Sequence, residues 1–185
     1  MRVAVIGTGY LGAVHAAGMA HLGFDTVGVD VDEAKVAALQ SGTSPFYEPG
    51  FDPILAEQVA GGRLRFSTDF SEISDADVVF IGVGTPQKAD SHAADLTYID
   101  SAIASITPHL KDGALVAGKS TVPVGTAQRL AEYVAEHTAE GVTAELAWNP
   151  EFLREGFAVQ DTLHPDRLVF GVTSERAEKV LREVY

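Results

Sequence analysis

The stretch "NPEFLREG", from Asn149 to Gly156, places two carboxylates four residues apart, at Glu151 and Glu155. Four residues make about one helical turn, so a helix here would carry both carboxylates on one face. Asn149 is suited to cap such a helix and Pro150 to begin it, which makes a solvated helix start the simplest explanation of Glu151. Glu155 needs another explanation, because like charges at this spacing destabilise a helix by about 0.2–0.5 kcal/mol.

A second candidate site is "GTGYLG", Gly7 to Gly12, which directly follows the apolar run from Arg2 to Ile6. The pattern G-x-G-x-x-G between a strand and a helix is typical of dinucleotide binding. Gly7 would make the tight turn, Gly9 would let a pyrophosphate approach the backbone, and Gly12 would let the helix lie close to the strand. The amides at the start of the helix would face the phosphates.

An acid at the end of the second expected strand, residues 25–30, would determine whether NAD or NADP binds. Asp30 stands at that place. Its carboxylate would accept hydrogen bonds from the adenosine ribose and repel a 2′-phosphate, which favours NAD over NADP. Asp32 is the competing acid, although it is better placed to cap the next helix. Lys35 could reach the ribose or could be a solvated surface lysine.

Two further motifs follow strands. "GVGTPQ", Gly82 to Gln87, could lie along the ribose and pyrophosphate of a cofactor or could be a plain turn. In "KSTVPVGT", Lys119 to Thr126, the hydroxyls of Ser120 and Thr121 would face the nicotinamide. The alternative is that Ser120 or Thr126 is an ordinary helix cap.

Hydrophobic runs alternate with helical patterns along the whole chain. Strands are expected over residues 2–6, 25–30, 64–67, 77–83, 114–120, 143–149 and 167–172. Helices are expected over residues 10–22, 33–40, 54–60, 96–106 and 125–137, and from a cap at Ser174 onward; residues 41–53 should form an ordered loop. Strands that are hydrophobic throughout and separated by helices predict a doubly wound α/β fold, with a parallel sheet covered on both faces.

Ligands of this fold bind beyond the carboxyl ends of the strands, so motifs that all follow strands should meet in one crevice. Two carboxylates beside a nicotinamide and a threonine could activate water or move protons, which weakens the solvated-helix explanation. Arg167 in "HPDR" could add a positive charge there, or could form a structural ion pair with Glu151, Glu155 or Asp161.

The composition restricts the class of protein. A chain of 185 residues fits one domain, and a hydrophobic content of 46% allows a sizeable core. The formal net charge of −13 argues against nucleic acid and against an anionic membrane as partners. The chain has no cysteine, and its six histidines lack metal-ligand spacing, so no metal is expected. His15 and His21 are interpreted as structural or exposed, and Trp148 as core. Without a signal peptide or an apolar run of membrane-spanning length, a cytoplasmic location is expected.

Six motifs together resemble those of the UDP-glucose 6-dehydrogenase family: "GTGYLG", "SPFYEPG", "GVGTP", "ADLTYID", "KSTVPVGT" and "NPEFLREGFAVQDTLHPDR". The last two are specific, and they also weigh against the sister dehydrogenases of GDP-mannose and of N-acetylated sugars. The resemblance implies an NAD-binding Rossmann domain over residues 1–173. It implies that residues 174–185 begin a helix leading to a C-terminal part that is absent here.

Members of this family oxidise the C6 alcohol of UDP-glucose to a carboxylate with two NAD⁺ and without release of the aldehyde. By resemblance, Glu151 is the general acid/base of thioester hydrolysis, Thr121 helps to position the catalytic water, and Glu155 lies close to both nicotinamide and sugar. The resemblance assigns substrate contacts to Glu151, Phe152, Leu153, Arg154 and Glu155. It assigns NAD contacts to Gly7, Gly9, Tyr10, Leu11, Gly12, Asp30, Lys35, Val83, Gly84, Thr85, Pro86, Gln87, Ser120, Thr121, Val122 and Glu155.

The family also needs a cysteine nucleophile, a lysine and an asparagine from a later part of the chain. This chain is therefore expected to bind NAD and to lack the full oxidation. The family's dimers form mainly through the absent central helix, so the full-length protein is expected to be a homodimer and this chain could be monomeric. Two alternatives stay open, namely a stand-alone NAD-binding or sensing module and the same half of a dehydrogenase for another nucleotide sugar.

Overall fold

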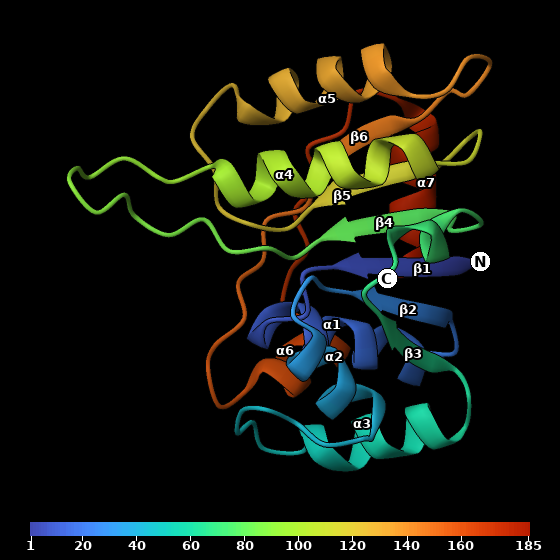
Figure 1. Cartoon of the computed structure of the whole chain (residues 1–185), viewed down its shortest axis with the longest axis vertical. Helices are drawn as coiled ribbons and strands as arrows, with labels where there is room; N and C mark the ends of the chain where they lie inside the picture. The colour runs from blue at the N-terminus through green and yellow to red at the C-terminus, as the bar shows by residue number, and fades with distance from the viewer.

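The computed structural model describes residues 1–185 and contains one six-stranded sheet in which every paired strand is parallel. The order across the sheet is β3-β2-β1-β4-β5-β6 (Figure 1). The strands are β1 (Arg2–Ile6), β2 (Asp25–Val29), β3 (Leu64–Ser67), β4 (Val78–Ile81), β5 (Leu115–Gly118) and β6 (Glu145–Trp148). This is the strand order of dinucleotide-binding doubly wound sheets, so the predicted fold class is confirmed.

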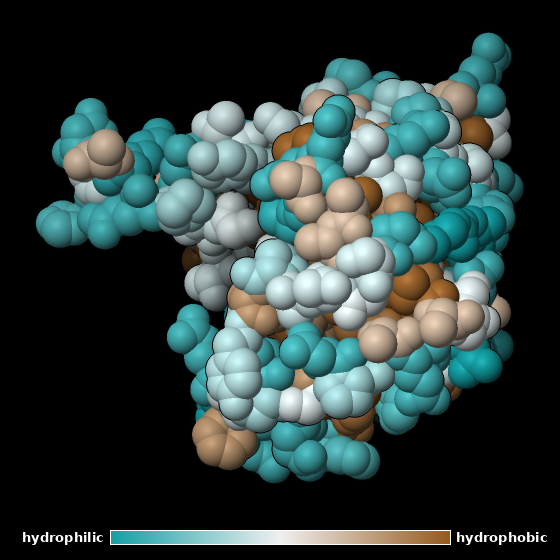
Figure 2. Space-filling view, turned by 60° about the horizontal axis from the view of Figure 1, so that its bottom comes forward, coloured by the Kyte–Doolittle hydropathy of each residue, from teal (hydrophilic) through white to brown (hydrophobic).

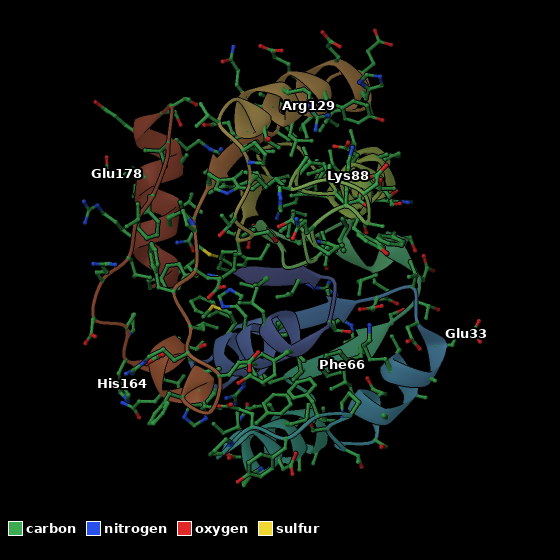
Figure 3. The ribbon with its side chains drawn as sticks, turned by 90° about the vertical axis from the view of Figure 1, so that its left-hand side faces the viewer. Glu33, Phe66, Lys88, Arg129, His164 and Glu178 are labelled. Atoms are coloured by element: carbon green, nitrogen blue, oxygen red, sulfur yellow. The ribbon has the colours of Figure 1, made fainter.

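Helices cover both faces of the sheet. One face carries α1 (Tyr10–His21), α2 (Glu33–Gln40), α3 (Phe51–Ala60), α6 (Ala158–Leu163) and α7 (Glu175–Val184). The other face carries α4 (Thr97–Ile106) and α5 (Thr126–His137), with the 3₁₀ helices η1 (Phe70–Ile73) and η2 (Thr107–His109). Figure 3 shows α7, with Glu178, on the opposite side of the sheet from α5, with Arg129.

The two hydrophobic cores explain why the strands are apolar throughout. Side chains alternate between the faces of a strand, and in β1 Val3 and Val5 join one core while Ala4 and Ile6 join the other. β4 divides in the same way. Because helices cover both faces, a polar residue in the middle of β1 or β4 would bury a polar group.

The register of the sheet brings the candidate motifs to one edge. Ile6 pairs with Val29 on one side and with Ile81 on the other, and Gly118 pairs with both Ile81 and Trp148. The residues that follow this row therefore emerge side by side; they are Asp30, Gly7, Gly82, Lys119 and Asn149. Figure 3 looks onto this carboxyl edge.

The helix expected from Asn149 onward is wrong. Residues 149–154 have no regular structure, and a turn follows at Glu155 and Gly156, where Gly156 has a φ of 84°. Asn149 is buried and caps no helix. The two glutamates consequently do not share a helical face, and their spacing needs no compensation for helix repulsion.

The strand expected over residues 167–172 is also wrong, because only Gly171 pairs, in an isolated antiparallel bridge with Trp148. The helix α6 and both 3₁₀ helices were not predicted, and α3 begins at Phe51 rather than at residue 54. The expected ranges 2–6, 33–40 and 64–67 match the structure, and the other boundaries differ by at most two residues. The caps predicted at Asp32 and Ser174 are confirmed, since each side chain accepts a hydrogen bond from the third residue of its helix.

The segment that joins β4 to α4 extends away from the body as a long arm (Figure 1). A bridge between Gln87 and Ala94 closes it into a narrow loop. Its surface is mostly hydrophilic in Figure 2. No helix of the structure is long and apolar enough to cross a membrane, and no three His, Asp or Glu side chains are grouped as a metal site would require.

Replacing Gly12 by Ala should lower the free energy of unfolding by about 3 kcal/mol or more, because a Cβ at Gly12 would lie 1.8 Å from the carbonyl oxygen of Gly7. Gly9→Ala is the matched control, since nothing lies within 4 Å of its added Cβ. Urea unfolding of both variants measures the difference. Equal stabilities would show that α1 can move away from β1 at little cost.

Candidate functional site

A cleft of about 900 Å³ lies at the carboxyl edge of β1, β2 and β4. This volume is within the range of small-molecule sites. Of the predicted cofactor residues, the cleft is lined by Gly7, Gly9, Asp30, Lys35, Val83, Gly84, Thr85 and Pro86. Side chains of α4 and its flanks, including Tyr98 and Ser101, form the opposite wall.

The glycine turn presents unpaired amides to this cleft. The N-cap of α1 is Gly9, which offers no side-chain cap, and the amides of residues 9–12 have no hydrogen-bond partner in the protein. Gly7 has a φ of 84°, and an added Cβ there would lie 2.6 Å from Cγ1 of Val83. The space in front of Gly9 is open. Free amides at a helix start with room before them fit a pyrophosphate.

Asp30 is held at the other end of the cleft by hydrogen bonds from three sides. Its Oδ2 accepts from the amide of Thr8 at 2.7 Å and from Nζ of Lys35 at 2.9 Å, and its Oδ1 accepts from the amide of Asp32 at 3.1 Å. Burial alone would raise the pKa of Asp30, but these hydrogen bonds outweigh burial and lower the pKa. The carboxylate is therefore charged at neutral pH.

Lys35 is not a freely solvated lysine, because its ammonium forms the ion pair with Asp30 and its side chain is largely buried. The second carboxylate oxygen of Asp30 has capacity for one more donor. Together with the free amides of the glycine turn, this arrangement fits a dinucleotide whose ribose hydroxyls reach Asp30 and whose phosphates face α1.

The turns after β4 and β5 are fastened to each other. The hydroxyl of Thr85 donates to the carbonyl oxygen of Thr121 at 2.8 Å, and the hydroxyl of Ser120 donates to the carbonyl oxygen of Val83. The N-cap of α5 is Gly125, without a side-chain cap, so neither Ser120 nor Thr126 caps this helix.

Several predicted cofactor residues do not line the cleft. Gln87 belongs to the arm, where its amide nitrogen donates to the carbonyl oxygen of Ser91 at 3.0 Å. The others outside the lining are Tyr10, Leu11, Gly12, Ser120, Thr121, Val122 and Glu155.

A second cavity, of about 310 Å³, lies beside the loop after β6. Four of the five predicted substrate residues line it, namely Glu151, Phe152, Leu153 and Arg154. Its deeper walls are polar, with His15, Lys119, Asn149, Thr162 and Tyr185. Two buried atoms there, Nε2 of His15 and Oγ1 of Thr162, have no protein hydrogen-bond partner.

The two glutamates have different surroundings. The amide of Glu151 donates to the carbonyl oxygen of Lys119 at 3.2 Å, and its Oε2 accepts from the amide of Leu153 at 2.6 Å. These contacts fix the carboxylate against the end of β5. Glu155 is exposed and lines neither cavity. The pKa of Tyr10 is raised by burial, by Glu48 and, to a smaller extent, by the charge of Glu155.

The two arginines that line this cavity are already engaged. Arg154 pairs with Asp161, with 2.7 Å between Nη2 and Oδ1. The guanidinium of Arg167 lies over the ring of Phe152, 4.9 Å from its centroid. The ion pair considered for Arg167 with Glu151, Glu155 or Asp161 is therefore wrong.

The loop between β6 and α6, residues 149–157, carries both glutamates, and we call it the carboxylate loop. Glu48 holds its far end, and sequence reasoning assigned Glu48 no role. This buried carboxylate accepts from the amide of Gly156 at 2.9 Å, from the amide of Val159 at 3.3 Å and from the hydroxyl of Tyr10. It thereby ties the start of α1 to the end of the loop. The only signal in the sequence was its place within "SPFYEPG", where the glutamate is surrounded by turn-forming residues.

An open parallel sheet with this strand order, a glycine turn after β1 and a buried acid after β2 define a dinucleotide-binding domain of the Rossmann type. Over residues 1–185 the chain matches the family model described as UDP-glucose/GDP-mannose dehydrogenase family, NAD binding domain, and it belongs to that family. NAD is accordingly the cofactor of the domain.

Named relatives agree with this assignment. The chain is 42% identical to the UDP-glucose 6-dehydrogenase YwqF of Bacillus subtilis, covering all of this chain and 42% of the relative. A UDP-glucose dehydrogenase structure from Pyrobaculum islandicum gives a TM-score of 0.91 at 42% identity, covering all of this chain and 43% of that one. A ternary complex of GDP-mannose dehydrogenase from Pseudomonas aeruginosa gives 0.94 at 34% identity, covering all of this chain and 44% of that one. The chain thus spans about two fifths of these relatives' length.

His15 should make stability depend on pH. Burial, with a smaller contribution from the charge of Lys119, lowers the pKa of His15 well below its usual value of 6.5. Below pH 6.5 His15 binds a proton in the unfolded chain but stays neutral in the folded chain. The free energy of unfolding therefore decreases as the pH falls, by about 1.4 kcal/mol per pH unit. Urea unfolding between pH 7.5 and pH 5 should show a shallower loss for His15→Leu than for the parent chain. His21→Leu, at an exposed position, is the control, and parallel slopes for all three proteins would contradict the prediction.

Proposed function

We propose that this chain is the NAD-binding half of a dehydrogenase that oxidises UDP-glucose to UDP-glucuronate with two NAD⁺. The observation that carries the proposal is that the carboxylate loop and the dinucleotide cleft share one edge of the sheet. Glu151 is bonded to the backbone of Lys119, which is bonded in turn to Ile81, directly before the cleft residue Gly82. The substrate is taken from the names of similar proteins, such as the Bacillus subtilis and Pyrobaculum islandicum enzymes.

The cofactor would be held mainly by backbone. The amides of residues 9–12 would bind the pyrophosphate, and the carboxylate of Asp30 with the ammonium of Lys35 would bind the adenosine ribose. The turns of residues 83–87 and 120–122 would lie along the remainder of the cofactor, with Tyr10, Leu11 and Glu155 at its border. Bound NAD⁺ supplies the hydride acceptor.

The chain's own catalytic contribution would come from Glu151, Thr121 and Glu155. Glu151 would act as general acid/base, for which its place in the lining of the 310 Å³ cavity and its fixed carboxylate are suited. Thr121 would help to hold the attacking water, and Glu155 would lie between nicotinamide and sugar. The backbone from Phe152 to Glu155 would contact the sugar. The nucleophile would have to come from outside this chain, which has no cysteine.

A second candidate is the corresponding half of an enzyme that acts on another nucleotide sugar. The high similarity to a GDP-mannose dehydrogenase structure favours keeping this alternative. Both candidates need the same cofactor cleft and the same carboxylate loop. We also propose that the complete protein is a homodimer, as the resemblance to the family implies.

Titration calorimetry of this chain should show NAD⁺ binding with at least about tenfold preference over NADP⁺, because the charge of Asp30 repels a 2′-phosphate. Asp30→Asn keeps an acceptor for Thr8 and removes the charge, so it should narrow that preference. Asp32→Asn keeps the helix cap and serves as the control. If Asp30→Asn kept the same preference for NAD⁺ over NADP⁺, another residue would be responsible for that preference.

A chimera tests the catalytic part of the proposal. This chain should replace the matching N-terminal part of the Bacillus subtilis relative, and UDP-glucose-dependent formation of NADH should then be measured. We expect turnover that falls at least about 100-fold in Glu151→Gln, the loss typical of a missing general acid/base. A folded chimera that binds NAD⁺ without turnover would favour a stand-alone NAD-binding module instead.

A further inference from the structure

Lys119 is a buried cation without an anionic partner. The residue is 5% exposed, and none of the ion pairs of the structure includes it. Burial lowers its pKa to about 8, although the charge of Glu151 acts in the opposite direction. Lysines are almost never fully buried unless they are paired, since burial of an ammonium destabilises the fold. Filling of space does not explain a lysine at this position, because an apolar side chain of similar length would fill it without that cost.

The ammonium is the centre of a closed triangle of hydrogen bonds. Its Nζ donates to Oδ1 of Asn149 at 3.1 Å and to the hydroxyl of Tyr185 at 3.0 Å, and that hydroxyl donates to Oδ1 of Asn149 at 2.7 Å. The rings of Phe80 and Tyr185 lie 5.7 and 5.5 Å from Nζ. Burial also raises the pKa of Tyr185 above its usual range, so its hydroxyl keeps the proton that completes the triangle.

The triangle fixes the start of the carboxylate loop. Asn149, two residues before Glu151, donates through Nδ2 to the carbonyl oxygen of Val169 at 3.1 Å. The backbone of Lys119 accepts from the amide of Glu151 at 3.2 Å. The side chain and the backbone of one lysine therefore determine where the loop leaves β6 and where the Glu151 carboxylate stands.

We propose that Lys119 is a positioning residue for Glu151, acting through Asn149 and Tyr185. This inference rests on the proposed role of Glu151 as the general acid/base. It extends the function of "KSTVPVGT" beyond the hydroxyls of Ser120 and Thr121, which lie further along the same turn. It also connects the end of α7 to the carboxylate loop, through the hydrogen bond from the hydroxyl of Tyr185 to Asn149.

The test is Lys119→Met in this chain, followed by urea unfolding and by amide hydrogen exchange. If Lys119 only stabilised the fold, global stability and the protection of the loop amides would change together. Urea unfolding should show global stability that is equal or higher, because an unpaired buried charge has been removed. Amide hydrogen exchange at Glu151 and Leu153 should nevertheless become at least about tenfold faster, because the loop has lost its fixed end. The ¹³C signal of the Glu151 carboxyl should shift or broaden.

Lys179→Met, at a position of α7 where the side chain is 79% exposed, is the matched control and should change none of these signals. Tyr185→Phe removes one corner of the triangle and should give a smaller acceleration at the same amides, so the inference can be tested even if Lys119→Met does not fold. Unchanged exchange in both variants, or exchange that only follows global stability, would overturn the inference. NAD⁺ titration of the parent chain is independent of this outcome, and its failure would overturn the proposed function instead.

Discussion

Parallel pairing of β1 with β2 and β4 is the constraint on which the rest of the structure depends. The three strands end in one row, so backbone pairing alone brings together the glycine turn, Asp30 and the turn after β4. The same row continues through β5 and β6 to Lys119 and Asn149. Close contact between α1 and β1, with glycine at position 12, then directs the free amides of the helix into the cleft.

The parts that could be predicted from the sequence are those set by local pattern. Alternating apolar strands and helices gave the fold class, and the glycine turn with Asp30 gave the cofactor, because all of these signals lie within short segments. Asp32 and Ser174 were predicted as caps for the same reason, since a cap bonds to a residue three positions away.

The two elements that were predicted wrongly, the helix from Asn149 and the strand over residues 167–172, are determined by long-range contacts. Asn149, Pro150 and Glu151 carry good local signals for a helix start, yet bonds from distant parts of the chain prevail. Gly156 is bound by Glu48, 108 residues away, and Asn149 by Lys119, 30 residues away. The apolar run over residues 167–172 looks like a strand but crosses the end of β6 with only one pairing residue. No periodicity in the sequence records such long-range contacts.

Asp30 has two tasks, the repulsion of a 2′-phosphate and the acceptance of hydrogen bonds from Thr8, and a small or basic residue would perform neither. Its Oδ2 is the acceptor for both the amide and the hydroxyl of Thr8, a residue with no exposed surface in the middle of the glycine turn. A protein that exchanged this acid for a small or basic residue to accept a phosphorylated ribose would also leave a buried amide without an acceptor. Drift toward the other nicotinamide cofactor through such a residue is thus opposed by the folding of the turn itself, and redesign of cofactor choice needs a side chain, such as that of asparagine, that still accepts a hydrogen bond from Thr8.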